Sequence, residues 1–345
     1  MFIDCAEPSE SEPALLGRAA DWNQHRSLEL LDDKSLCQIT RAEGIDFATA
    51  LLFDRLQKSP HAAFIRKINS LRASTSSPPG KIRAKVVIVP GALYRERPEM
   101  GGDGKIVREV AESLGYETDL IPTASFGSVI KNASTILAWL KEHWGEPLIL
   151  VSLSKGGADL KIALASAGAA QLFGNVVAWI NVCGPLNGTR MADWILANRV
   201  RAWVVRLKCL LQNRDFELIT DLRHDRGALL KSPFRPPPSL RVINLIGFPL
   251  MRHMTTWFSR FCHRTLAEWG PNDGTTSLSD VCTWPGDLYP VWGADHYFHP
   301  EETARNLIFA VLRYLAEEVE SLQTFPANRR SIQLDLNGCS AGAKN

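Results

Sequence analysis

The feature that most constrains the fold is an alternation of short apolar runs with amphipathic stretches, which begins near residue 85. Four segments have the character of strands, at residues 85–90, 117–122, 147–152 and 176–182. Helices are predicted between them, at residues 106–114, 129–144 and 157–170. A strand that is apolar along its whole length is typical of a parallel sheet, because helices cover both faces of such a sheet. We therefore predict an α/β fold with a doubly wound, mostly parallel sheet.

The rest of the chain divides around this core. Apolar residues at helical spacing predict two short helices between residues 44 and 71, and a Ser/Pro/Gly-rich stretch at 74–80 is typical of a linker. Strand character returns at 242–246 and 288–292, and a terminal helix is predicted at 301–322. The predicted division is a helical N-terminal extension with linker (1–80), a core in two parts (81–188 and 241–325), a helical cap insertion (189–240) and a loosely ordered tail (326–345).

A strand-to-helix junction at Ser154 carries the strongest chemical signal. The apolar run that starts at Leu148 leads into Ser152-Leu-Ser154-Lys-Gly156-Gly and then directly into a predicted helix. This is the context of a nucleophile elbow, a tight turn that exposes a serine hydroxyl and needs small residues two positions to either side. Ser152 stands where the usual motif has glycine, and it is small enough for the turn. The alternative interpretation is a plain polar turn that caps a helix, since short Ser–Gly motifs also occur by chance.

A serine nucleophile needs a base, and the base needs a carboxylate that orients it. Two late loops supply such residues: Pro-Asn-Asp273-Gly-Thr-Thr follows the strand at 242–246, and Ala-Asp-His296-Tyr-Phe follows the strand at 288–292. Together with Val-Pro-Gly-Ala after the first core strand and with Ser-Leu-Ser-Lys-Gly-Gly, these pieces span roughly residues 85 to 315. In this combination and order the sequence resembles an α/β hydrolase of the lipase and esterase kind.

The resemblance implies a role for each matching residue. Ser154 would be the nucleophile, His296 the general base and Asp273 the acid that holds the base. Two backbone amides would form the oxyanion hole, those of Lys155 and of Ala92, with Leu93 in its place if the register shifts by one residue. In the turn that carries Ala92, the family has histidine where this chain has proline.

Other interpretations of these residues stay open at this point. Asp273 is also the residue type expected in an Asn-Asp-Gly turn. Asp280 and Asp287 are rival acids, interpreted as solvated or capping residues of loops. His299 fits the start of a helix, and Asp295 should point away from the base because it directly precedes it. The remaining histidines lie outside the motifs and are interpreted as surface or packing residues.

The insertion contains a predicted helix over residues 191–212 with an apolar stripe. The stripe consists of Leu196, Val200, Trp203, Leu207 and Leu211. We expect the stripe to be buried, because an exposed apolar patch of this length is a liability. Trp194 and Trp203 are predicted to contact an acyl-binding pocket, or alternatively to pack the cap onto the core. Arginines off the stripe suit anionic lipid or an acidic carrier group, with a solvated helix face as the alternative.

Composition excludes several classes of function. The chain has 39 Lys and Arg against 37 Asp and Glu, so its net charge of +2 gives no sign of nucleic-acid binding. No run approaches the roughly 18 apolar residues of a membrane helix, and the acidic first residues do not resemble a secretory signal. Seven scattered cysteines without a CxxC pair argue against a disulfide scaffold and a metal cage. A cytoplasmic location fits best.

The sequence thus predicts a serine hydrolase that cleaves a carboxylic ester or thioester through an acyl-enzyme, with no metal or organic cofactor. The expected partner is a small-molecule acyl ester or thioester, with no nucleic acid and no integral membrane association, while peripheral lipid contact stays open. Acyl transfer, or thioester cleavage on a carrier-bound acyl chain, is the alternative within the enzymes. A non-catalytic binding module of the same fold is the alternative outside them. The sequence indicates no oligomeric state.

Overall fold

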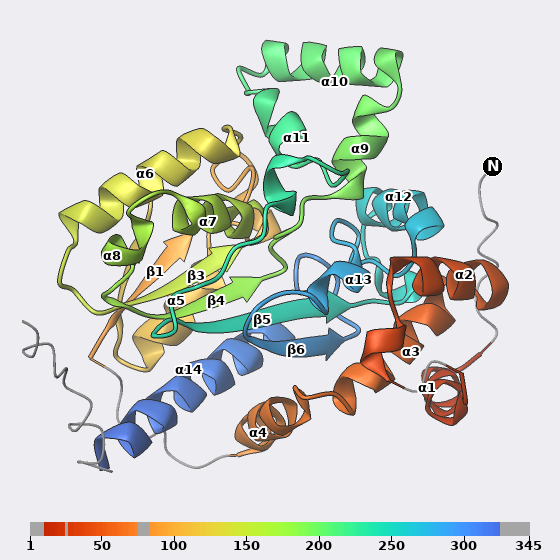
Figure 1. Ribbon diagram of the computed structural model, residues 1–345, viewed down its shortest axis with the longest axis horizontal. Coiled ribbons are helices and arrows are strands. Elements are labelled where there is room, and N and C mark those ends of the chain that lie inside the picture. Colours follow the sequence, from red (N-terminus) through yellow and green to blue (C-terminus); the bar gives the residue numbers. More distant parts are fainter. Residues whose placement is uncertain (1–9, 25–26, 75–82, 325–345) are drawn as a thin grey trace, which may run out of the picture.

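The computed structural model describes residues 10–24, 27–74 and 83–324. Within these ranges a single sheet of six strands has the order β2-β1-β3-β4-β5-β6, and every neighbouring pair is parallel (Figure 1). The strands are β1 (Lys85–Val89), β2 (Glu117–Leu120), β3 (Leu148–Leu153), β4 (Val176–Val182), β5 (Arg241–Phe248) and β6 (Asp287–Trp292). The predicted doubly wound sheet is confirmed, because the chain adds β2 on one side of β1 and β3 to β6 on the other.

Helices cover both faces of the sheet. The α-helices are α1 (Glu12–Asp21), α2 (Asp33–Glu43), α3 (Ile45–Gln57), α4 (Ala62–Ala73), α5 (Lys105–Ser113), α6 (Val129–Glu142), α7 (Lys155–Ala165), α8 (Ala169–Leu172), α9 (Arg190–Leu196), α10 (Arg199–Leu211), α11 (Glu217–Asp221), α12 (Trp257–Leu266), α13 (Leu278–Val281) and α14 (Glu301–Thr324). One face packs on α6, α7 and α8, and the other on α5 and α14. Successive strand residues point to opposite faces, so Val86 and Val87 belong to different core layers.

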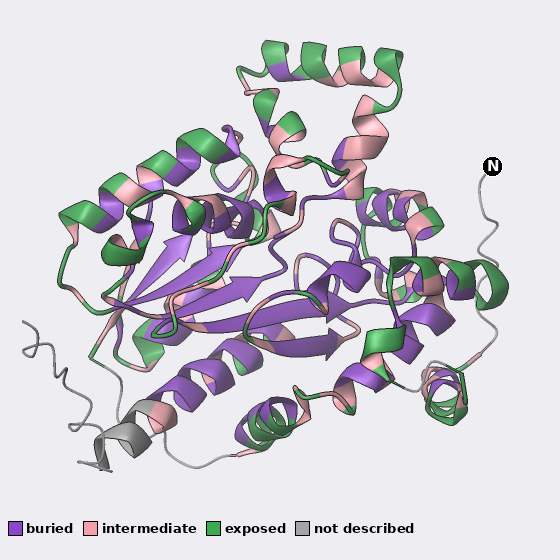
Figure 2. Cartoon of the chain, in the orientation of Figure 1, coloured by how far each residue is buried: buried purple, intermediate pink, exposed green. Residues whose placement is uncertain are grey.

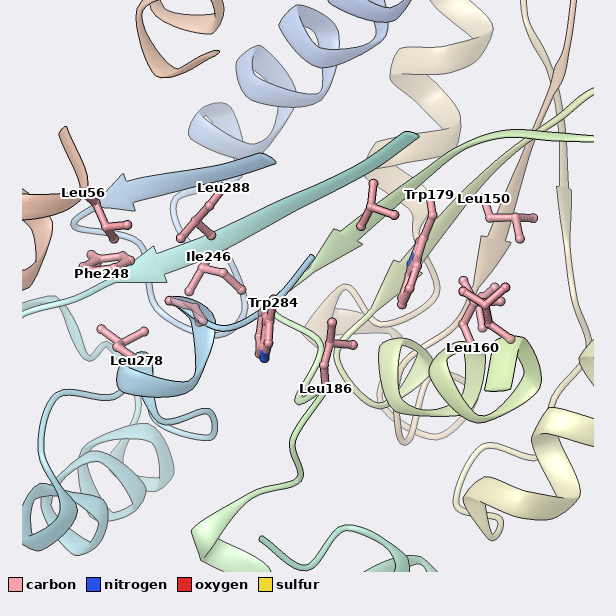
Figure 3. Close-up of a cluster of buried hydrophobic side chains, with 14 of the residues drawn as sticks. Leu56, Leu150, Leu160, Trp179, Leu186, Ile246, Phe248, Leu278, Trp284 and Leu288 are labelled. Atoms are coloured by element: carbon pink, nitrogen blue, oxygen red, sulfur yellow. The ribbon is translucent and has the colours of Figure 1, made fainter. Parts of the chain in front are cut away.

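The layer under α6 and α7 contains the bulkiest fully buried side chain of the described residues. Trp179 on β4 is fully buried in this layer, near Leu150 and Leu160 (Figure 3). The same layer continues past Ile246 and Leu288 toward the far edge of the sheet. A continuous apolar layer of this kind holds the strand ends in place, and the strand ends carry the candidate site.

The helices before the sheet belong to the core rather than forming a separate body. Leu51 and Leu56 of α3 lie in the layer that contains Trp179, whereas Ile65 and Ile68 of α4 lie in the opposite layer. The two helices predicted between residues 44 and 71 are confirmed. Helices α1 and α2 were not predicted. Most of the predicted linker, at residues 75–80, and the tail at 326–345 lie outside the described residues.

Residues 190–221 form an arm of α9, α10 and α11 that stands off the sheet, with α10 across its tip (Figure 1). The single helix predicted over residues 191–212 is wrong, because α9 ends at Leu196 and α10 begins at Arg199. Asn198 causes the restart, since its side chain caps α10 by accepting a hydrogen bond from the amide of Arg201 at 3.0 Å. Helix α11 covers 5 residues and ends at Asp221.

None of the helices in the described ranges combines the length and the apolar character that crossing a membrane requires.

Candidate active site

Ser154 lies at the junction between β3 and α7, at the carboxyl end of the sheet. Its backbone has φ 47° and ψ −122°, a conformation that residues other than glycine rarely adopt. The amide of Ser154 donates to the carbonyl of Val182 at 2.9 Å, which ties the turn to the neighbouring strand. A Cβ at Gly156 would lie 2.3 Å from the carbonyl oxygen of Val89, so the turn needs glycine there.

Ser152, the residue that departs from the usual elbow pattern, is fully buried in β3. Its hydroxyl accepts a hydrogen bond from the indole N–H of Trp179 at 2.8 Å and donates to the side-chain carbonyl of Asn181 at 3.2 Å. A buried hydroxyl is tolerated when it is hydrogen-bonded. The neighbouring strand therefore explains how serine replaces glycine at this position.

The structure brings Ser154, His296 and Asp273 together from three separate loops. The Oγ of Ser154 lies 2.8 Å from Nε2 of His296, and Nδ1 of His296 lies 3.0 Å from Oδ2 of Asp273. The backbone adds to this pairing, because the amide of His296 donates to the carbonyl of Asp273 at 3.0 Å. The chain order and the contacts match the geometry of a serine, histidine and carboxylate triad.

The carboxylate of Asp273 is fully buried and held by its own turn. Its Oδ1 accepts hydrogen bonds from the amides of Thr275 at 2.8 Å and Thr276 at 2.6 Å, which leaves Oδ2 for the imidazole. Asp273 is thus both the turn residue and the partner of His296, so the two interpretations of this residue do not compete.

Two opposing effects set the charge preference of His296. Burial lowers the pKa of the imidazole, but the charge of Asp273 and the hydrogen bond to it raise that pKa, and the net shift is upward from 6.5. Asp295 adds a smaller upward contribution to the pKa of His296. The site therefore favours the imidazolium that a general base becomes once it takes a proton.

The backbone near Ser154 distinguishes the two candidates for the second oxyanion amide. The amide of Leu93 is already occupied, because it donates to the carbonyl of Ser125 at 3.0 Å. In the described part of the chain, no oxygen atom accepts a hydrogen bond from the amide of Ala92 or of Lys155. Free donors are what an oxyanion hole requires, so the geometry favours Ala92 over Leu93.

A cavity of about 90 Å³ opens beside Ser154 and His296. Its wall is mostly apolar and comes from the loop after β1, from α5 and from the start of α14, through residues such as Met100, Ile106 and Ile308. Neither Trp194 nor Trp203 lines this cavity, contrary to prediction. The reason is their position on the arm: Trp203 is exposed on α10, and Trp194 packs against Phe261 of α12.

Asp280, interpreted from the sequence as a solvated or capping residue of a loop, is instead buried in a second histidine–carboxylate pair. Its Oδ2 lies 2.7 Å from Nε2 of His224, and Asn187 donates to its Oδ1 at 3.3 Å. Burial raises the pKa of the Asp280 carboxyl, but the hydrogen bonds from His224 and Asn187 and the nearby charges of His224 and Lys231 together lower that pKa below its ordinary value. His224 belongs to the segment after α11, so this pair ties the base of the arm to α13. It has no contact with Ser154, because His296 occupies that place.

Neither of the other two aspartates orients His296. Asp287 forms an ion pair with Arg241 at 2.7 Å. Asp295 accepts hydrogen bonds from the amides of Tyr297 at 3.0 Å and His299 at 3.3 Å, so its carboxylate stabilises its own loop rather than orienting His296.

A buried network behind the elbow was not predicted. The side chain of Lys155 is almost fully buried and contacts Asp159 one helical turn later at 2.5 Å. Asn132 on α6 donates to the same carboxylate at 2.9 Å and accepts from the amide of Ala124 at 2.9 Å. Burial raises the pKa of Asp159 to about 6, although Lys155 opposes this shift. The i, i+4 spacing of Lys155 and Asp159 was a signal in the sequence; the part played by Asn132 was not.

In the described ranges, one group has the arrangement that a metal ion needs: ligand atoms of Cys183, Asp273 and His296 lie within 4.8 Å of one another. Burial raises the pKa of the Cys183 thiol well above its usual range, which disfavours the thiolate that binds metals. Both oxygens of Asp273 already accept hydrogen bonds. The group is better explained by the Asp273–His296 pair than by a metal site.

Comparison with known proteins gives similarity of structure only. No protein-family profile matches the chain, and no curated protein matches it. The structure is similar to that of a metagenomic carboxyl esterase, with a TM-score of 0.56 and 21% identity over 71% of this chain and 80% of the esterase. It is also similar to a lipase of Bacillus licheniformis in its mature form, with a TM-score of 0.50 and 20% identity over 70% of this chain and 94% of the lipase. At these identities the likeness establishes the fold.

Proposed function

Since the chain has the α/β-hydrolase fold, we propose that it is a serine hydrolase that cleaves a carboxylic ester or thioester through an acyl-enzyme. One observation carries the proposal: Ser154 Oγ lies 2.8 Å from Nε2 of His296, beside an apolar cavity, with Asp273 on the far side of the imidazole. The names of the two similar structures, an esterase and a lipase, support an ester as the bond that is cleaved.

In the first half of the reaction, Ser154 Oγ attacks the carbonyl carbon and its proton passes to Nε2 of His296. The amides of Ala92 and Lys155 donate to the oxygen that becomes negative in the tetrahedral intermediate. His296 then returns the proton to the departing alcohol or thiol, which leaves the acyl group on Ser154. In the second half, water attacks the acyl carbonyl while Nε2 of His296 takes a proton from it. The bond to Ser154 Oγ then breaks, His296 returns the proton to Oγ, and the carboxylic acid is released.

Asp273 keeps the reacting nitrogen available. Because its Oδ2 accepts from Nδ1 of His296, the neutral imidazole carries its proton on Nδ1 and presents a lone pair at Nε2. The carboxylate also stabilises the imidazolium that forms during attack, which agrees with the upward shift in the pKa of His296.

The wall of the cavity supports an ester with a small apolar group next to the reacting carbonyl. The cavity has a volume of about 90 Å³, which suits a short acyl chain, and its lining by Met100, Ile106 and Ile308 suits hydrocarbon. Acyl transfer to an alcohol or amine uses the same first half-reaction, so product analysis separates the two activities. The cytoplasmic location stays a prediction from cysteine usage.

An activity-based fluorophosphonate probe tests the proposal, because it reacts with a serine only when a base activates it. The wild-type chain should be labelled, and Ser154→Ala should not be. Ser166→Ala, at the far end of α7, is the matched control and should be labelled like the wild type. Absence of wild-type labelling, or labelling that persists in Ser154→Ala, would refute the proposal and favour a non-catalytic binding module.

A second measurement addresses the substrate. Hydrolysis of p-nitrophenyl esters and CoA thioesters of graded chain length should fall as the acyl group outgrows the cavity. Ile308→Ala should widen the range toward longer chains, since pocket contacts of this size are worth roughly 1–3 kcal/mol in kcat/KM. A preference for long chains in the wild type would contradict the assignment of this cavity.

A further inference from the structure

Helix α10 presents an apolar face to solvent. Six large apolar side chains of this helix are exposed, namely Val200, Trp203, Val204, Leu207, Leu210 and Leu211. Val200 is 71% exposed and Leu211 76%, values that are ordinary for lysine and unusual for these residue types. Figure 2 shows α10 at the tip of the arm, largely exposed. The expected burial of the apolar stripe is therefore wrong for its four residues on α10, which face solvent, whereas Leu196 on α9 is half-buried.

The exposed residues lie on one side of the helix. Their spacing of three and four residues, from Val200 through Trp203 and Leu207 to Leu211, places them on a single face. The opposite side of α10 faces the protein, and there Cys209 is buried. A surface helix of a globular protein normally has the reverse arrangement, with its apolar face toward the core.

Basic side chains border this apolar face. Arg199 and Arg206 lie along one edge of it and Lys208 along the other, all three exposed, and α10 contains no acidic residue. The charge is concentrated locally, because residues 189–214 hold six of the chain's 39 basic residues and one of its 37 acidic residues. Arg201 points inward instead, with its guanidinium 3.4 Å from the ring centroid of Trp194.

We propose that α10 docks the protein on a membrane surface that contains anionic lipid. The apolar face would enter the boundary between headgroups and acyl chains, and Arg199, Arg206 and Lys208 would meet the negative headgroups. At 13 residues the helix is too short to span a bilayer, which needs about 20, so it lies in the surface. The proposal does not depend on the proposed ester chemistry.

Charge favours lipid over a second copy of the chain. Two copies of α10 packed through their apolar faces would bring basic edges against basic edges with no acidic residue to offset them. An anionic surface meets both edges of the apolar face at once. The position of α10 at the tip of an arm also suits an extended surface better than a groove-shaped partner.

The arm and the candidate active site share the carboxyl end of the sheet. Thr189, at the base of the arm, donates to the carbonyl of Thr275 at 2.5 Å, and the amide of Thr275 donates to Asp273. Docking through α10 would therefore hold this end of the sheet, rather than the opposite one, near the lipid.

Co-sedimentation of the full chain with vesicles tests the proposal. One set of vesicles contains phosphatidylcholine alone, and the other contains about a third phosphatidylserine. The wild type should bind the second set at low salt and bind the first set much less. Trp203→Ser/Leu207→Ser should lower the partition coefficient by at least about tenfold. Arg199→Gln/Arg206→Gln/Lys208→Gln should lower it by about a hundredfold.

The matched control is Trp144→Ser, which removes an exposed tryptophan that follows α6 and should bind like the wild type. Circular dichroism of each variant checks that the fold is retained. If Trp203→Ser/Leu207→Ser does not fold, the triple glutamine variant still tests the proposal by itself. Absence of binding to anionic vesicles, or equal binding by all variants, would overturn the proposal. So would wild-type dimers in sedimentation velocity that Trp203→Ser/Leu207→Ser dissociates, because the face would then bind a second copy.

Discussion

At the carboxyl end of the sheet, ionisable side chains are buried and paired with one another, whereas on α10 apolar side chains are left in solvent. Asp273, His296 and Asp159 are all buried, and each has a hydrogen-bonding partner from another loop or helix or from the next turn of its own helix. On α10 only Cys209 is buried. Buried ionisable groups raise the free energy of the folded protein unless their partners stay in place. Exposed apolar side chains are unfavourable in water unless something outside the chain covers them. Substitutions that remove a partner in the first region should therefore lower activity or stability. Polar substitutions on α10 should leave the stability of the isolated protein nearly unchanged.

The largest effect is expected at the reacting pair. Ser154→Ala or His296→Ala should lower kcat by about 10⁴ to 10⁶, and the double variant should lose little more, because the two side chains act as one unit. Steady-state hydrolysis of a short p-nitrophenyl ester measures both. Losses that add up in the double variant would mean that the two residues act independently.

A somewhat smaller loss is expected at the acid. Asp273→Asn should cost on the order of 10⁴ in kcat with the fold intact, because an amide N–H in place of the carboxylate favours the wrong tautomer of His296. Asp287→Asn is the matched control, since its ion pair with Arg241 lies at the start of β6, away from the site. If Asp287→Asn or Asp280→Asn caused the loss instead, the assignment of the acid would be wrong.

The dependence of activity on pH should follow His296. Its pKa is raised above 6.5, and only the neutral imidazole accepts a proton, so kcat/KM should rise as pH passes through a value above 6.5. In Asp273→Asn the charge that raises this pKa is gone while burial remains, so the midpoint of the residual activity should move to lower pH. An unchanged midpoint would show that Asp273 does not set the pKa of the base.

Stability should depend strongly on the pair behind the elbow. Lys155→Met leaves the carboxylate of Asp159 buried without its counter-charge and should lower the free energy of unfolding by about 3 kcal/mol. Lys155→Met/Asp159→Leu removes both charges and should recover much of that loss. Urea denaturation of the wild type, the two single variants Lys155→Met and Asp159→Leu, and the double variant measures the coupling energy between the two side chains. Purely additive losses would mean that the pair is not coupled.

The smallest effect is expected on the arm. In the absence of membranes, Trp203→Ser and Leu207→Ser should each change the free energy of unfolding by no more than about 0.5 kcal/mol, because these side chains are exposed. The same urea titrations provide this measurement. A large loss of stability would show that α10 packs on the body of the protein in solution, and the contrast between the two regions would disappear.

Much of the fold was predictable because it depends on local pattern. Residues 86–89 and 148–151 are apolar without interruption, and that pattern indicates strands with helices on both sides. The order of Ser154, Asp273 and His296 on loops after strands was also visible in the sequence. Parallel strands bring such loops to one edge of the sheet, which is why the three residues were expected to meet. Their catalytic roles remain predictions.

The tertiary structure decided which way the apolar face of α10 points and which residues far apart in the sequence form pairs. Periodicity identified the apolar stripe of α10 but not that the stripe faces solvent, because spacing within a helix carries no information about what lies beside it. The pairing of His224 with Asp280 joins residues 56 positions apart, and Asn132 reaches Asp159 from another helix. No local pattern encodes these contacts; they exist only because packing on the sheet brings distant segments together.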